Sequence, residues 1–181
     1  GVVIYYAVNG GNFQLLTEYA SVNSSFVHNG LTNGYYYTYK VAVYNNGSRT
    51  NSPGGEGANS TIAGALPITI PNAPLSFTAT PSSSRITLNW TNPVFTGGIG
   101  VPLSGVVIYR GYSYGTWVPV YWYSGANESF IDTDVIDGIP YFYCVAVYNN
   151  GSRTATPGGE GILSAYAAAT PLSPPSEPQN V

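Results

Sequence analysis

The segment VAVYNNGSRT occurs twice in this chain, at residues 41–50 and 145–154. It belongs to a longer repeat, because residues 1–77 align without a gap with residues 105–181, each residue having its counterpart 104 positions later. A unit of about this size buries enough apolar surface to fold by itself. The repeat therefore predicts copies of one domain, not a single fold spread over the whole chain.

Strand signals dominate the sequence. Short runs rich in Val, Ile, Thr and Tyr alternate with turns, and the chain contains 22 Gly and 14 Pro. In the second copy we expect seven strands, at residues 76–80, 85–90, 105–111, 117–123, 128–133, 141–148 and 162–170. Pro119 marks the fourth of them as an edge strand, because proline cannot donate to a sheet. The sequence predicts an all-β fold of the β-sandwich type.

Alternation within these strands predicts the core, because successive side chains point to opposite faces of a sheet. We expect one buried cluster made of Ile86, Leu88, Trp90, Val106, Ile108, Tyr141, Tyr143, Val145 and Val147. Four neighbours should point away from it, namely Thr87, Asn89, Phe142 and Cys144. On this interpretation Cys144 is a surface or interface thiol, and its counterpart in the first copy is Lys40.

Several of these features together resemble the fibronectin type III family. They are the Pro-rich entry PNAP, Trp90 on the second strand, the third strand GVVIYRG, and the run VIDGIPYFYCVAVYNNG. The resemblance covers essentially the whole chain and implies tandem immunoglobulin-like (fibronectin type III) β-sandwiches. It also implies that Tyr141, and Tyr37 in the first copy, are corner tyrosines whose hydroxyls bond back to the preceding turn. The first copy departs at His28, where the second copy has Asp132.

The repeat gives three expected parts. Residues 1–70 are a partial repeat with the third to seventh strands only, so the first copy lacks its first two strands. Residues 71–174 are a complete repeat, and residues 175–181 match the start of a third. Without two strands, the first copy would expose Val2, Ile4, Tyr37, Tyr39, Val41 and Val43. Either the chain is a window of a longer tandem array, or another subunit supplies the missing strands.

Composition argues against several functions. Only 7% of residues are charged, the net charge is −3 and the five basic residues are scattered, which does not suit nucleic acid. No apolar run reaches the length of a membrane span. Neither His28 nor Cys144 has the partners that an enzyme needs. Asp132, Asp134 and Asp137 lack the spacing of a calcium loop, so we interpret them as a solvated turn. We expect no enzyme activity, metal or cofactor.

Six asparagines lie in N-x-S/T acceptor sequences, and a charge-poor surface is made soluble by glycans. They are Asn23, Asn46, Asn59, Asn89, Asn127 and Asn150. The alternative is that these are polar loops without sugar. The acceptors favour an extracellular or cell-surface location.

The loop after the sixth strand is copied almost without change, since residues 41–57 and 145–161 differ only at two positions. Recent duplication is one explanation. The other is that the loop makes the same contact in every repeat. Its charged residues, Arg49, Glu56, Arg153 and Glu160, are then interface candidates that pair within the loop or across a junction between repeats.

We therefore expect a structural component of an extracellular filament, surface layer or stalk, similar in composition to archaeal cell-surface proteins. Its partners would be copies of itself or neighbouring repeats, joined head to tail as an open fibre with the copied loop near the junction. The alternative is a non-catalytic spacer of a secreted hydrolase or adhesin.

Overall fold

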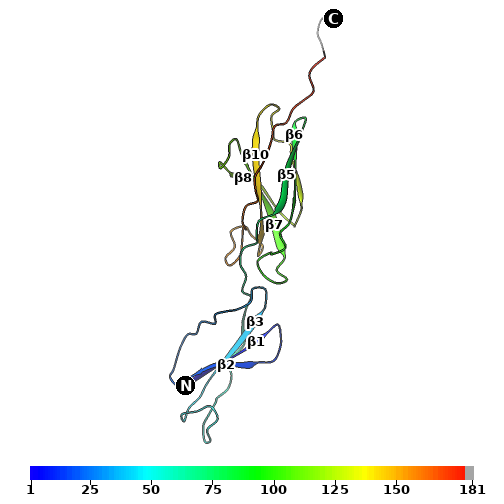
Figure 1. The fold of residues 1–181 in the computed structure, drawn as a ribbon. Helices are drawn as coiled ribbons and strands as arrows, with labels where there is room; N and C mark the ends of the chain where they lie inside the picture. The colour runs from blue at the N-terminus through cyan, green and yellow to red at the C-terminus, as the bar shows by residue number, and fades with distance from the viewer. Residues whose placement is uncertain (178–181) are drawn as a thin grey trace. The chain divides into compact units, whose positions relative to one another are not determined.

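The computed structural model describes residues 1–177 and divides into two compact units, unit 1 (Gly1–Ile68) and unit 2 (Thr69–Val181). All regular structure within the described residues is antiparallel β-strand (Figure 1). No helix in this part of the chain is long and apolar enough to cross a membrane. Most of 175–181, the expected start of a third repeat, lies outside the described residues.

Unit 2 is a sandwich of two sheets. One sheet has the order β11-β10-β7-β8 and the other the order β5-β6-β9. In Figure 1 the yellow β10 and the green β5 run side by side along the unit, and the two strands are in contact. The strands are β5 (Leu75–Ser82), β6 (Arg85–Thr91), β7 (Leu103–Gly111), β8 (Val118–Ser124), β9 (Ser129–Asp132), β10 (Tyr141–Asn149) and β11 (Ala167–Ala169).

The predicted core of unit 2 is confirmed. All nine residues expected inside form one buried cluster between the two sheets, completed by Ala169. β6 contributes Ile86, Leu88 and Trp90 at every second position, and Asn89 between them is exposed. Burial of this set stabilises the sandwich because each large side chain contributes about 1.5–3 kcal/mol when removed from water.

Two further expectations are confirmed in unit 2. β8 is an edge strand, and Pro119 lies opposite Tyr109 at the bulge between β7 and β8. The hydroxyl of Tyr141 accepts a hydrogen bond from the backbone N–H of Ile136 at 3.0 Å, which is the corner contact. In unit 1 the hydroxyl of Tyr37 accepts from the N–H of Thr32, also at 3.0 Å.

The prediction that Cys144 is a surface thiol is wrong. Its side chain points away from the core, but only 1% of the residue is exposed. The segment 163–166 follows the copied loop and shares a small cleft with Cys144, Tyr114 and Trp117, so the outer face of β10 is covered here. Burial, followed by the charge of Glu160, raises the pKa of the thiol to about 12.

The expected last strand, 162–170, is regular only over β11. Before it, the chain bonds to β10 through a side chain as well as the backbone. The N–H of Ser164 donates to the carbonyl of Val145, and the Ser164 hydroxyl accepts from the N–H of Val145. This side-chain contact interrupts the ladder and shortens the strand.

Unit 1 repeats one sheet of the sandwich and has only that sheet among its described residues. Its order is β2-β1-β3-β4, in which each strand is the counterpart of one in the sheet β8-β7-β10-β11. The strands are β1 (Val2–Val8), β2 (Gln14–Tyr19), β3 (Tyr37–Val43) and β4 (Ala63–Ala65). The counterpart of β9, residues 25–28, forms no strand, contrary to the expectation of five strands. In unit 2 β9 pairs with β6, and within the described residues unit 1 has no such partner strand.

Candidate interaction site

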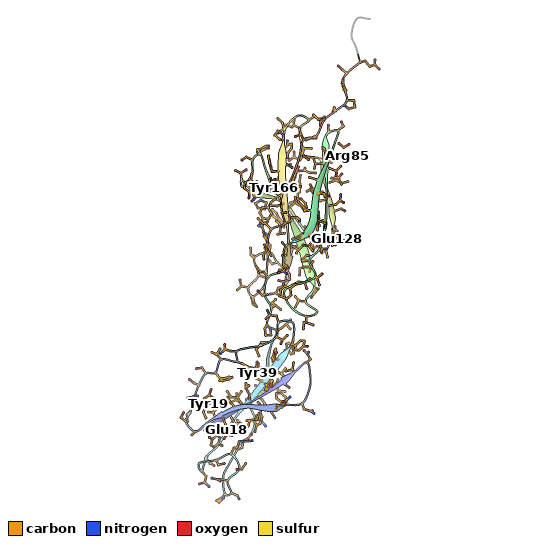
Figure 2. All side chains as sticks on the ribbon, viewed as in Figure 1. Glu18, Tyr19, Tyr39, Arg85, Glu128 and Tyr166 are labelled. Carbon is orange, nitrogen blue, oxygen red and sulfur yellow. The ribbon has the colours of Figure 1, made fainter. Side chains whose placement is uncertain are left out.

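The face of the unit 1 sheet that corresponds to the core of unit 2 forms a groove. The groove has a volume of about 490 Å³. Its floor includes Val2 and Ile4 of β1 and Tyr39 and Val41 of β3, and its wall is the segment 23–31. Tyr39 is labelled on β3 in Figure 2. We call this feature the open groove.

The expectation that six residues would be bare on this face is only half right. Val2, Ile4 and Tyr37 are buried. Phe26 and Leu31 of the wall line the same groove as Val2 and Ile4, and the ring of Tyr37 contacts His28. By contrast, Val41 is 36% exposed and Val43 is 61% exposed. The open part of the face therefore lies along the second half of β3.

His28 lies at the centre of an aromatic cluster in the wall. Its Nδ1 is 2.9 Å from the hydroxyl of Tyr39, and its ring lies edge-on to Tyr6, with centroids 5.3 Å apart. Phe26 and Tyr37 also contact the His28 ring. This cluster fixes the segment 23–31 against the sheet without a charged pair.

At the corresponding position in unit 2 the chain has an ion pair. Asp132 is fully buried, accepts from the hydroxyl of Tyr143 at 2.9 Å, and receives Nη1 of Arg110 at 2.8 Å. The prediction of a solvated turn is therefore wrong for Asp132, although the side chain of Asp134 is 76% exposed. The sequence analysis did not predict that the neighbours of this position also differ between the units. Arg110 and Asp134 of unit 2 correspond to Tyr6 and Gly30 of unit 1.

Burial and the Asp132 carboxylate set the ionisation of this cluster. Burial, and then the charge of Asp132, raise the pKa of Tyr143. Burial lowers the pKa of Arg110, but hydrogen bonds to Asp132 and Asp134 outweigh it, so the pKa of Arg110 is raised overall. Tyr143 is thus a neutral phenol beside the ion pair of Arg110 and Asp132 at neutral pH.

The copied loop is held to its unit by side-chain hydrogen bonds to a tyrosine of a neighbouring strand. In unit 2 the hydroxyl of Tyr109 donates to Glu160, Nε of Arg153 donates to Glu160 at 2.8 Å, and Nη2 of Arg153 donates to the Tyr109 oxygen. In unit 1 the hydroxyl of Tyr5 donates to both oxygens of Glu56. Sequence reasoning missed the tyrosine, although GVVIY is present in both copies.

The backbone of the loop is held in the same way in both units. The side-chain oxygen of Asn149 accepts from the N–H of Gly159 at 2.9 Å, and that of Asn45 accepts from Gly55 at 3.0 Å. Gly159 has a φ of 94°, and a Cβ there would lie 2.6 Å from the carbonyl oxygen of Ala155. Only glycine fits such a position. The conformation therefore explains the second glycine of PGGEG.

The four interface candidates pair inside their own unit. Arg153 pairs with Glu160, while Arg49 lies 3.8 Å from Glu56 and 2.8 Å from Glu18. The counterpart of Glu18 in unit 2 is Trp122, and the Arg153 guanidinium lies 5.6 Å from its ring centroid. The expected contact of this loop with a neighbouring repeat stays a prediction.

All six acceptor asparagines are exposed. Asn46 and Asn150 lie in the copied loops and donate their side-chain N–H to the carbonyls of Pro53 and Pro157. Among residues 1–177 no group of three or more His, Cys, Asp or Glu side chains is placed to hold a metal ion.

The comparisons with known proteins concern the fold. No family model matches the sequence, and a search of curated proteins finds no relative. A solved structure of domains A168-A170 from titin is similar over 95% of this chain and 55% of its own, with 13% identity and a TM-score of 0.58. Chicken CNTN1 FN1-FN3 domains match 96% of this chain and 56% of theirs, with 17% identity and a TM-score of 0.51. The chain thus spans little more than half of each structure, and its fold is of the fibronectin type III type.

Proposed function

We propose that this chain is a structural component of an extracellular filament, surface layer or stalk, in which fibronectin type III-type modules follow one another head to tail. The observation that carries the proposal is the open groove. One module has a closed sandwich, while the other has a sheet face with room for an element of a neighbour. Heterologous contacts of this kind propagate as open fibres instead of closing on themselves.

The chemistry of the modules supports a mechanical role. Three of the five basic residues, Arg49, Arg110 and Arg153, pair with carboxylates of their own unit, and the acceptor asparagines are all exposed for glycans in an extracellular setting. Loops such as 45–57 and 149–161 are fixed by side-chain contacts, which suits a spacer of defined shape.

Microscopy of the native material tests this proposal. An antibody raised against residues 69–177 should label uniform fibres, stalks or a continuous layer at the cell surface in negative stain. An antibody against an unrelated cytoplasmic protein is the matched control. Label on dispersed particles only, with none on an assembled structure, would contradict the proposal.

A further inference from the structure

The second unit shows which element covers the face that is open in the first. Val145 and Val147 of β10 are fully buried, whereas their counterparts Val41 and Val43 in β3 are 36% and 61% exposed. In unit 2 these valines belong to one core cluster with Ile86, Leu88 and Trp90 of β6, and unit 1 has no counterpart of that strand among its described residues. The difference between the units is the hairpin β5–β6.

The wall of the open groove also presents an unpaired edge. In unit 2 β6 pairs antiparallel with β9, placing Leu88 opposite Phe130 and Ile86 opposite Asp132. The counterparts of these two β9 residues are Phe26 and His28, in a segment that pairs with no strand among the described residues. Water can satisfy the backbone groups of this exposed segment, but an unpaired edge is also a template for an added strand.

We propose that the open groove binds a two-stranded β-hairpin with the chemistry of β5–β6. Its inner strand carries apolar or aromatic side chains at alternate positions and pairs antiparallel with residues 25–28. One inward residue lies opposite Phe26 and the next lies opposite His28, in the register of Leu88 and Ile86. This is strand addition, in which backbone bonds give affinity and alternate side chains give specificity.

The lining of the groove selects an uncharged strand. His28 and Tyr39 are its only titratable lining groups, and no carboxylate corresponds to Asp132. A buried Arg or Lys on the incoming strand would find no partner there, so the groove disfavours it. A second copy of unit 1 placed face to face would fill the apolar floor but leave the edge 25–28 without backbone partners.

The inference rests on the proposed function in one respect: it names the hairpin as the element that a neighbouring repeat contributes to the groove. A thiol-labelling experiment tests it in solution, whether or not filaments form. The full chain carrying Val43→Cys has one exposed thiol on the same sheet face as the open groove, two residues along β3 from the lining residue Val41, and the buried Cys144 serves as an internal reference. The probe is a synthetic peptide of residues 75–91.

The peptide should slow alkylation at position 43 by up to about tenfold when nine in ten grooves are occupied, because the free tenth still reacts. A peptide with Ile86→Ser, Leu88→Ser and Trp90→Ser should leave the rate unchanged. A thiol outside the groove, introduced by Asn59→Cys, should react at the same rate with and without peptide. A further variant joins a copy of residues 71–104 in front of Gly1, repeating the natural Ser104–Gly105 junction, and should protect position 43 without added peptide.

Protection by the joined hairpin but not by the free peptide supports hairpin binding in the open groove and assigns the hairpin to the same polypeptide. Protection by the free peptide as well supports a hairpin from another subunit. Unchanged labelling in both arms overturns the inference. Labelling that slows with rising concentration of the chain itself, without any hairpin, shows that a second copy occupies the face and also overturns it. Microscopy of fibres is a separate measurement, so either proposal can fail alone.

Discussion

Tyr143 donates its hydroxyl hydrogen to the fully buried carboxylate of Asp132, 2.9 Å away, in the core of unit 2. At the same place in unit 1 the hydroxyl of Tyr39 lies 2.9 Å from Nδ1 of His28. One contact belongs to an ion pair with Arg110 and the other to an aromatic cluster. The tyrosine hydroxyl thus bonds to the polar side chain at this position in either chemistry, to a fully buried carboxylate in unit 2 and to a partly buried imidazole in unit 1.

Asp132→Asn should destabilise unit 2 by about 3 kcal/mol, because it leaves the Arg110 charge without its buried partner. Asp134 still binds Arg110, which places the loss at the lower end of the range. Urea unfolding followed by tryptophan fluorescence measures it, since all three tryptophans, Trp90, Trp117 and Trp122, lie in unit 2. Asp134→Asn, at an exposed carboxylate, is the matched control and should cost less than about 1 kcal/mol. An equal loss in both variants would contradict the assignment.

The uncharged His–Tyr pair of unit 1 should replace the Asp132–Arg110 ion pair of unit 2 when both residues are introduced together. Asp132→His combined with Arg110→Tyr removes both charges and supplies the His28–Tyr6 pair. The combined variant should lose less stability than the sum of the two single variants, because contacting residues are coupled. The same denaturation measurement gives the coupling free energy, and simple additivity would count against the correspondence.

Trp90→Ala should lower the free energy of unfolding of unit 2 by about 3–5 kcal/mol, as other buried aromatics do. Only 4% of Trp90 is exposed, and it packs between the two sheets. Trp122→Ala is the control, because 59% of that residue is exposed and its main partner is the Arg153 guanidinium. The two remaining tryptophans report unfolding in each variant. A loss in Trp90→Ala no larger than in the control would contradict the proposed core.

Unit 2 should lose stability as the pH rises from about 10 to about 12. Burial raises the pKa of Tyr123 to about 12. Burial, with the hydrogen bond and charge of Glu160, does the same for Tyr109. Unfolded tyrosines lose their protons near pH 10, so in this window the unfolded state binds fewer protons and stability falls with pH. Denaturation midpoints across the window measure the fall, and a midpoint that stays constant from pH 9 to 12 would contradict it.

Glu160→Gln should lower the pKa of Tyr109, because the carboxylate contributes to its raised value after burial. Burial remains, so the pKa should stay above its ordinary value. Carbon-13 NMR of labelled tyrosine follows the titration, and the pKa of Tyr123, which burial alone raises, is the control. In unit 1, Glu56→Gln should shift Tyr5 in the same direction. No change at either tyrosine would argue against the shared loop contact.

Native protein should carry N-linked glycans on exposed acceptor asparagines. Intact mass spectrometry of this segment should then give values above the bare 19.1 kDa, which return to it after enzymatic deglycosylation. Asn89, exposed beside Trp90, is a site to map by peptide analysis. A native mass equal to that of the bare chain would refute glycosylation.

The sequence by itself determined the features that depend on strand period and on local turns. The core of unit 2, the outward position of Asn89, the edge strand at Pro119 and the corner bond of Tyr141 were all predicted. The core and the outward positions follow from the strand pattern because alternate residues of a strand face opposite sides. The corner bond of Tyr141 followed from the resemblance to the fibronectin type III family.

The tertiary structure decided what depends on segments that cross from elsewhere. Cys144 is buried because residues 163–166 cover its strand, and Asp132 is paired because Arg110 reaches it from β7 in the opposite sheet. The charged residues of the loop bond to a tyrosine 44 to 51 positions away, a contact that no local pattern indicates. Residues 25–28 form no strand, although their counterpart β9 does. A strand requires hydrogen bonds to a partner strand, and the sequence of the segment itself does not show whether that partner is present.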